Sequence, residues 1–559
     1  MLLDVRADHL KIVQEILRKF VPEREVWAFG SRAKWLAKEY SDLDLCIVGD
    51  SALSFRTLGL LEEAFEDSDL PYKVDVVDWA TTSESFRKII ERDRVMVQRG
   101  NTFENPVVRL GDYVDACLGK MLDAQKNRGV LQPYLGNSNV RWGIFDLQEL
   151  AVMRFEEHEE ERYSIRDGDL IVCEGGEPGR CAIWRGDVPN MKIQKALHRV
   201  RTKPELDNHF LYYWFLRAGS TGELEPFFTG TTIKHLTGKA LAELRIPLPP
   251  IDVQRGVAKV LRSLDAKIAL NRRINQTLEA MAQAIFKSWF VDFDPVKAKI
   301  AAKQEGRDPL SAAMSTICGK SDTELDALPC EQYEQLAATA ALFPDELEES
   351  ELGAIPRGWS VRAMPECIDV NPSRLLKKGA VAQYLDMANV PTNSARAQKV
   401  VSREFTSGSK FKNGDTLLAR ITPCLENGKT AFVDFLNGDE VGWGSTEFIV
   451  LRPKNGLPEP FAYFLCRDPD FRAFAIAQMA GTSGRQRVPN DCFVGYKLVQ
   501  PAGLIAIEFG RLAGAALNQI KALDEEAKTL ANLRDTLLPK LLSGELSVEN
   551  ILPESEDTA

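Results

Sequence analysis

The 559-residue sequence lacks the signatures of several functional classes. Its ten cysteines are scattered without CxxC pairs or zinc spacing, so we expect reduced thiols and no structural zinc. No apolar run reaches the roughly 18 residues of a membrane span, and no signal peptide precedes the first helix-like stretch. A GxxxxGK[ST] loop is absent, which argues against an ATP-driven motor, and so is the Asn-Pro-Pro-aromatic motif of adenine methyltransferases. We expect a cytoplasmic protein of several domains.

Charge is unevenly distributed along this acidic chain, whose net charge is −11. Residues 291–350 hold 13 acidic and 5 basic residues, whereas residues 361–500 hold 18 basic and 14 acidic ones. A net negative charge is unusual for a nucleic-acid-binding protein. The partition nevertheless leaves a basic region in the second half, where contact with a polyanion is expected. The acidic segment has the composition of a partly ordered linker.

Two long stretches carry the apolar stripe of amphipathic helices. The first covers residues 251–290, after a Pro-Pro stop, and at 1.5 Å per residue it predicts a helix of about 60 Å. The second covers residues 503–545 and follows Pro501. Helices of this length with a single apolar stripe need a partner helix, because one small domain cannot bury them. We therefore predict that the two pair as an antiparallel coiled coil.

A β-rich module precedes each long helix, so the chain contains an internal repeat. The segment YSIRDGD leads into an apolar run with a Gly-rich turn, and KFKNGD leads into a matching run. The fold class is α+β and multidomain. The predicted domains are an N-terminal α/β domain at 1–100, β-rich domains at 107–250 and 351–502, helices at 251–290 and 503–545, and an acidic linker at 291–350.

The N-terminal hundred residues predict a small α/β domain with a polar edge. One strand ends at Gly30 and Ser31, and the next contains Asp42 and Asp44. Alternation places both aspartates on one face of that strand, and Asp75 lies on a third strand, YKVDVVDW. Three carboxylates suit Mg²⁺, which binds hard oxygens together with substrate phosphates, and Gly30 lets the backbone approach a triphosphate. A bare DxD is also common in turns, so the whole pattern carries the prediction.

Two loops of the β-rich modules are candidates for DNA contact. The first, FFTGTTIKHLTG, offers hydroxyl and ammonium groups that suit phosphates, from Thr231, Thr232 and Lys234. The matching loop, MAGTSGRQRVP, is more basic and offers Ser483, Arg485 and Arg487. Arginine pairs bidentately with guanine in the major groove. A phosphate contact or an ordinary solvated turn is the alternative for these residues.

The order Gly30-Ser31, Asp42-x-Asp44 and Asp75 resembles the minimal nucleotidyltransferases of the DNA polymerase β-like family, over roughly residues 8–100. The family usually has glycine after Arg-Ala, where this chain has Lys34. The resemblance implies that the aspartates hold Mg²⁺ and catalyse nucleotidyl transfer, with Gly30 and Ser31 at the nucleoside triphosphate. A domain of this kind can also be inactive, and then binds nucleotide or serves as an antitoxin-like interaction module.

Residues 107–545 resemble the DNA-specificity (S) subunit of type I restriction–modification enzymes. The segments that carry the resemblance are GDLIVCEGGEPGRCAIW, QKALHRV, GTTIKHLT, IPLPPIDVQRGVAKVL and FKSWFVDFDP. The resemblance implies two target-recognition domains that bind double-stranded DNA. It also implies two methyltransferase subunits and restriction (translocase/nuclease) subunits as partners, which would use S-adenosylmethionine and ATP. The N-terminal domain departs from the pattern of this family, because an S subunit does not need such a domain.

Two function hypotheses follow. In the first, the chain reads two short DNA sequences around an unread spacer of at most roughly 18 base pairs, since 60 Å of helix spans that much DNA at 3.4 Å per pair. It then directs the partner subunits to that site without catalysing methylation. In the second, the chain is mainly a Mg²⁺-dependent nucleotidyltransferase for a partner protein or nucleic acid, and the β-rich modules are targeting parts. An Asp44→Ala variant separates the two.

Overall fold

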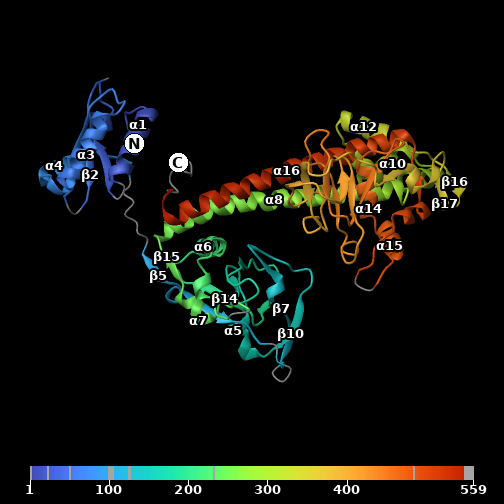
Figure 1. Ribbon diagram of the computed structural model, residues 1–559, viewed down its shortest axis with the longest axis horizontal. Helices are drawn as coiled ribbons and strands as arrows, with labels where there is room; N and C mark the ends of the chain where they lie inside the picture. The colour runs from blue at the N-terminus through green and yellow to red at the C-terminus, as the bar shows by residue number, and fades with distance from the viewer. Residues whose placement is uncertain are drawn as a thin grey trace. The chain divides into compact units, whose positions relative to one another are not determined.

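The computed structural model describes residues 3–21, 24–38, 40–49, 52–98, 106–121, 123, 127–230, 233–482 and 485–546 (Figure 1). The chain divides into two compact units, Met1–Asp265 with Ala531–Ala559, and Ala266–Leu530. Each unit contains one β-rich module together with adjoining stretches of both long helices. Within these described ranges, no helix has the length and apolar character needed to cross a membrane.

A four-stranded sheet in the order β3-β2-β1-β4 forms the N-terminal domain. Its strands are β1 (Glu25–Phe29), β2 (Leu43–Val48), β3 (Val74–Asp78) and β4 (Val95–Gln98). Alternation divides β1 between two cores, because Val26 and Ala28 face α1 (Ala7–Phe20) and α3 (Phe55–Glu66). Trp27 and Phe29 instead pack with Ile90 of α4 (Glu84–Asp93). Helices therefore cover both faces and leave the strand ends for polar groups.

The first β-rich module is built on a sheet in the order β12-β11-β14-β6. These strands are β6 (Val114–Leu118), β11 (Leu170–Cys173), β12 (Cys181–Ile183) and β14 (Leu197–Thr202). A second sheet contains β10 (Ala151–Phe155), β7 (Val130–Leu135) and β13 (Lys192–Ile193). The chain ends of the module meet where β5 (Val107–Arg109) pairs with β15 (Arg245–Pro247). The helix α6 (Asn208–Thr221) buries an aromatic face against the main sheet.

The second β-rich module repeats this topology. Its main sheet has the order β24-β23-β26-β19, which matches β12-β11-β14-β6 strand for strand along the chain. These strands are β19 (Ile368–Val370), β23 (Thr416–Ala419), β24 (Thr430–Phe432) and β26 (Phe448–Pro453). The remaining elements are β18 (Ser360–Ala363), β20 (Val381–Leu385), β21 (Val401–Glu404), β22 (Ser409–Phe411), β25 (Gly442–Gly444), α14 (Pro460–Arg467), α15 (Pro469–Ala477) and β27 (Lys497–Gln500). As in the first module, its outer strands, β18 and β27, pair with each other.

A buried aspartate marks the same position in both modules. In the first, Asp169 accepts a hydrogen bond from the backbone of Arg166 at 2.8 Å and is held bidentately by Arg201. In the second, Asp415 accepts from the backbone of Lys412 at 2.7 Å and from Arg374 at 2.9 Å. Each aspartate follows a glycine with positive φ, at +88° and +83°. The Gly-Asp pair seen in the sequence therefore makes one turn twice, and it gives a one-to-one alignment of the modules.

Residues 291–350 differ from the partly ordered linker expected from composition. They form α9 (Asp294–Gln304), α10 (Pro309–Cys318), α11 (Asp322–Asp326), α12 (Cys330–Ala341) and the strand β16 (Leu347–Ser350), which pairs with β17 (Gly353–Pro356). A small core of Ala313, Met314, Leu325 and Ala340 holds the helices. Several of the acidic residues cap helix N-termini, as Asp308 does for α10 and Glu324 for α11. Composition alone does not separate this role from that of a solvated linker.

The long helices are α8 (Ile251–Phe290) and α16 (Gly503–Ser543). In the unit Ala266–Leu530, Asn271 donates to the backbone carbonyl of Leu523, and Asn275 to that of Ile520, both at 3.3 Å. In the other unit, Arg534 lies 2.7 Å from Asp265, which also accepts a hydrogen bond from Tyr213. In the unit Ala266–Leu530, the later of the two α8 residues thus contacts the earlier of the two α16 residues, as in antiparallel helices. The mixed α/β class with its N-terminal nucleotidyltransferase-like domain is as predicted.

Candidate nucleotidyltransferase site and DNA-contact loops

The nucleotidyltransferase-like site begins where β1 turns into the short helix α2 (Gly30–Ala33). Gly30 has a φ of +75°, and a Cβ atom built on it would lie 2.1 Å from Asp44 Oδ2. A larger residue would collide with this carboxylate, so glycine allows the backbone to lie directly against it. Ser31 lies in the first turn of α2. The turn therefore leaves no room for a side chain beside Asp44.

The sheet register brings the aspartates together. β2 and β3 are parallel neighbours, and Asp44 lies opposite Asp75. Asp42 is exposed and immediately precedes β2, so it lies just outside the strand that was predicted to contain both aspartates. Burial raises the pKa of Asp44, and the carboxylates of Asp75 and Asp42 raise it further. The three groups thus repel one another in their charged forms, and a divalent cation would relieve that repulsion.

Asp75 has a competing partner. Lys73 Nζ lies 2.6 Å from Asp75 Oδ1, and both side chains are largely solvated. In the described part of the chain, one set of three possible ligands has its atoms within 4.8 Å of one another, and it is not the aspartates. An exposed ion pair of this kind contributes little to stability, so a metal can displace the lysine. The donor set fits Mg²⁺, with Asp42, Asp44 and Asp75 as the residues that would hold it.

Arg32 is a positioning residue that sequence reasoning missed. Its side chain is buried, and it donates to the carbonyls of Ser41 at 2.8 Å and Asp4 at 3.0 Å. The guanidinium also stacks 3.7 Å from the ring centroid of Tyr72. Because Ser41 directly precedes Asp42, Arg32 fixes the chain where the aspartate pair begins. The sequence feature that could have indicated this role is the position of Arg32 directly after Gly30 and Ser31.

Neutralising Asp44 should stabilise the N-terminal domain in the absence of metal. The folded-state pKa of Asp44 is raised above its ordinary value, so its charge opposes folding, and stability rises as pH falls through the raised pKa. We expect slower hydrogen–deuterium exchange in β1 and β2 for Asp44→Asn than for the wild type at neutral pH in EDTA. Mg²⁺ should slow exchange in the wild type only. The control Asp69→Asn, at an exposed carboxylate, should behave as the wild type, and faster exchange in Asp44→Asn would contradict this account.

The first DNA-contact loop is closed by a bridge between Thr229 and His235, whose backbone groups exchange hydrogen bonds at 2.8 Å. Thr231 and Thr232 lie outside the described residues. Lys234 is exposed, and its Nζ lies 3.5 Å from the carboxylate of Glu225. Such a pair is weak in water. Lys234 is therefore placed at the surface, where an incoming phosphate can compete with Glu225.

The second loop is closed in the same way, by a bridge between Ala480 and Arg487. Ser483 lies outside the described residues, and Arg485 is exposed. Arg487 holds Glu447 with Nε and Nη2, at 2.7 to 2.9 Å. This bidentate pair lowers the pKa of Glu447 and occupies the Nε/Nη2 edge of the Arg487 guanidinium. In this geometry Arg487 is tied to Glu447, and both Arg485 and Arg487 are exposed.

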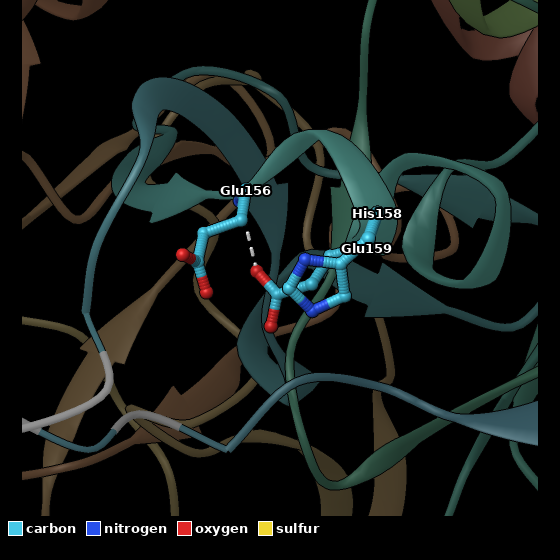
Figure 2. A group of neighbouring side chains, drawn as sticks. All are labelled: Glu156, His158 and Glu159. Atoms are coloured by element: carbon cyan, nitrogen blue, oxygen red, sulfur yellow. Dashed lines mark hydrogen bonds between the residues drawn. The ribbon is translucent and has the colours of Figure 1, made fainter.

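Glu156, His158 and Glu159 are the set of possible ligands with closely spaced atoms in the described part of the chain (Figure 2). The backbone N–H of Glu156 donates to Glu159 Oε2 at 2.9 Å, as in a helix cap. Lys120 Nζ lies 2.5 Å from the same oxygen and is buried. Burial alone would raise the pKa of Glu159, but these two donors outweigh it and lower the pKa. The cluster is thus a capped turn with an ion pair, and its carboxylate is already satisfied.

Two family models match consecutive parts of the chain. "Type I restriction modification DNA specificity domain" matches residues 104–280, and "Polymerase beta, Nucleotidyltransferase" matches residues 11–101. The type I restriction enzyme HindI specificity subunit of Haemophilus influenzae is 27% identical over 403 residues, which are 68% of this chain and 87% of that protein. The MjaIX specificity subunit of Methanocaldococcus jannaschii is 21% identical over 390 residues, 69% of this chain and 79% of that protein.

The N-terminal domain has a separate relative. The probable protein adenylyltransferase MntA of Haemophilus influenzae is 51% identical over 105 residues, which are 19% of this chain and 92% of that protein. Both resemblances noted in the sequence are therefore confirmed. Residues 104–280 thus carry a type I restriction modification DNA specificity domain, the chain is similar to type I specificity subunits over about two thirds of its length, and residues 11–101 carry a domain of the polymerase β nucleotidyltransferase family.

Proposed function

We propose that this chain selects a bipartite DNA target and directs methyltransferase and restriction subunits to it. The observation that carries this proposal is the duplication of one topology. Two modules have main sheets of matching strand order, and each leads into a helix of 40 or 41 residues. Two modules with different loops read two different short sequences, and the DNA between them is not read.

The two long helices set the distance between the half-sites. In this proposal α8 and α16 pair along their length as an antiparallel coiled coil. The hydrogen bonds of Asn271 and Asn275 to α16 carbonyls support this, because buried asparagine on such a seam fixes its register. A helix of 40 residues is about 60 Å long, which limits the gap to roughly 18 base pairs.

Two methyltransferase subunits dock on the outer faces of these helices, and restriction subunits join the complete enzyme. S-adenosylmethionine and ATP are used by those partners. Exposed apolar side chains on both helices support the docking, because a partner subunit could bury them. These side chains are Val253, Leu270, Ile274, Met281, Leu504, Ile507 and Leu533.

In this proposal the N-terminal domain transfers the nucleotidyl group of a nucleoside triphosphate to a protein hydroxyl, breaking the α–β phosphoanhydride bond and releasing pyrophosphate. Asp42, Asp44 and Asp75 hold Mg²⁺, which would neutralise the triphosphate and orient its reacting phosphorus. Gly30 and Ser31 lie at the phosphates. Residues 1–100 hold 19 acidic and 15 basic residues, so their net charge of −4 gives a nucleic-acid acceptor no electrostatic attraction, which favours a protein acceptor. The name of the adenylyltransferase relative agrees with a protein acceptor.

Selection from a pool of randomised duplex DNA tests the recognition function. The full chain should enrich molecules that share two short sequence blocks separated by a constant gap, as read by sequencing after several rounds. A chain with residues 351–502 replaced by a second copy of residues 107–250 should enrich two copies of one block. Enrichment of a single uninterrupted block by the wild type would contradict the bipartite assignment.

A further inference from the structure

The second recognition module contains a basic pocket of about 310 Å³. It lies between the segment that follows β19, the strand β22 and the residues around the ends of β23 and β26. Its charged lining residues are Arg374, Lys410 and Arg420, and no carboxylate is present among the described residues that line it. Ser409 and Asn490 add neutral polar groups. The pocket therefore offers three cations and no anion.

These cations are only partly neutralised by their surroundings. Arg374 donates to the buried Asp415, but Lys410 Nζ donates to the backbone carbonyl of Arg374 at 3.2 Å. Arg420 Nη1 donates to the neutral amide of Asn490 at 3.1 Å. The buried Nε atoms of Arg374 and Arg420 have no hydrogen-bond partner among the described residues. Lys410 and Arg420 have no anionic acceptor within hydrogen-bonding distance among the described residues.

A neighbouring carboxylate does not supply that acceptor. Glu447 lies near enough to Arg420 for the two charges to interact, but its oxygens are held bidentately by Arg487. The pocket is also continuous with the DNA-contact loop. The carbonyl of Arg420 accepts from the backbone of Val488 at 2.9 Å, directly after the bridge that closes the loop. Arg420 therefore lies next to the base of the loop that contains the exposed Arg485.

The fold itself does not require the charges of Lys410 and Arg420. The backbone of Leu236 donates to the carbonyl of Glu174 at 2.7 Å in the first module, as that of Val488 does to Arg420 in the second. The aligned Gly-Asp turns likewise match Ser164 with Lys410. The first module thus has a hydroxyl and a carboxylate where the second has two cations. Because the same topology forms with opposite charge, the cations serve a purpose other than folding.

We propose that this pocket binds a backbone phosphate of DNA next to the half-site that the second module reads. The proposal rests on the DNA-recognition function proposed above. A phosphate carries the negative charge that Lys410 and Arg420 lack, and phosphate contacts fix a protein on the duplex without reading sequence. The first module has Ser164 and Glu174 at the positions aligned with Lys410 and Arg420, so the two half-sites are held unequally in this proposal. The second module supplies more of the electrostatic affinity.

The salt dependence of DNA binding tests the assignment. Full-length Lys410→Gln and Arg420→Gln are compared with the wild type by titrating duplex DNA between 50 and 200 mM salt. Each lost phosphate contact lowers the slope of log affinity against log salt by about 0.9. We expect that loss in each variant, with weaker binding to every DNA sequence alike. Lys412→Gln is the matched control, because Lys412 lies two residues from Lys410 and lines a neighbouring cavity with Asp439 and Glu459.

The outcomes separate this proposal from the one on which it rests. If the wild type binds DNA and both variants keep its slope, the phosphate site is wrong and the recognition function stands. If the variants lose affinity only for the selected target and keep the slope, these residues read bases and the phosphate assignment is wrong. If the wild type shows no salt-dependent DNA binding, both proposals fail. Unchanged thermal unfolding of each variant shows that the module is folded.

Discussion

Removing one heptad from α8 together with the opposing heptad from α16 should shorten the gap between the two half-sites by about one to three base pairs. Seven helical residues span about 10.5 Å, which corresponds to three base pairs of DNA. Residues 268–274 and 522–528 are suitable, because Asn271 contacts Leu523 within this stretch. A deletion of seven keeps the apolar seam in phase. The gap is read from sequencing of methylated sites.

Deletion of only one of the two heptads provides the control. It leaves one helix seven residues longer than its partner, so one apolar heptad has no partner, and a hydrogen bond such as that of Asn271 to Leu523 is lost. We expect unfolding of the helical region or loss of site-specific methylation rather than a shorter gap. An unchanged gap after the double deletion, with methylation intact, would show that the helices do not set the distance.

Asp44→Asn should reduce nucleotidyl transfer on the order of 10²-fold or more while site-specific methylation stays unchanged. Asp44 lies against Gly30 and opposite Asp75, so it is the carboxylate that connects the triphosphate side of the site to the metal side. The amide keeps the shape of the side chain and removes its charge. Transfer is measured with α-labelled nucleoside triphosphate and Mg²⁺ on proteins co-expressed with the full chain.

Two further variants make the result specific. Asp69→Asn removes an exposed carboxylate outside the site and should retain full transfer. Gly30→Ala should lose transfer as Asp44→Asn does, because its Cβ would lie 2.1 Å from Asp44 Oδ2. Undiminished labelling by Asp44→Asn would remove the catalytic assignment. Loss of methylation in the same variant would mean that the N-terminal domain is needed for DNA recognition.

The parts of the fold that follow from local periodicity could be predicted from the sequence. Apolar residues at steps of three and four, after Pro249 and Pro250, indicate where α8 begins, and it ends at Phe290. The Gly-Asp turns before β11 and β23 reveal the duplication, because each needs a glycine with positive φ. Segment 291–350 was harder to interpret, since an acidic helix cap and an acidic linker have similar composition.

The site residues divide in the same way. The proximity of Asp44 and Asp75 could be predicted from the sequence, because each lies in a segment whose apolar residues indicate a β-strand. The fixation of Arg487 could not be predicted, because Glu447 is 40 positions away in the sequence and is brought near only by the sheet. The basic pocket likewise draws Arg374, Lys410 and Arg420 from three separate segments. Such a site depends on tertiary placement, which neither spacing nor composition encodes.

Mapping of methylated bases tests the central claim most directly. The full chain is expressed with the products of its neighbouring genes in a host that lacks other methylation, and the genome is sequenced for modified bases. The account predicts modification at one bipartite sequence, two fixed blocks separated by a gap of constant length no greater than about 18 base pairs. Methylation without sequence preference, or at a single continuous sequence, would contradict it.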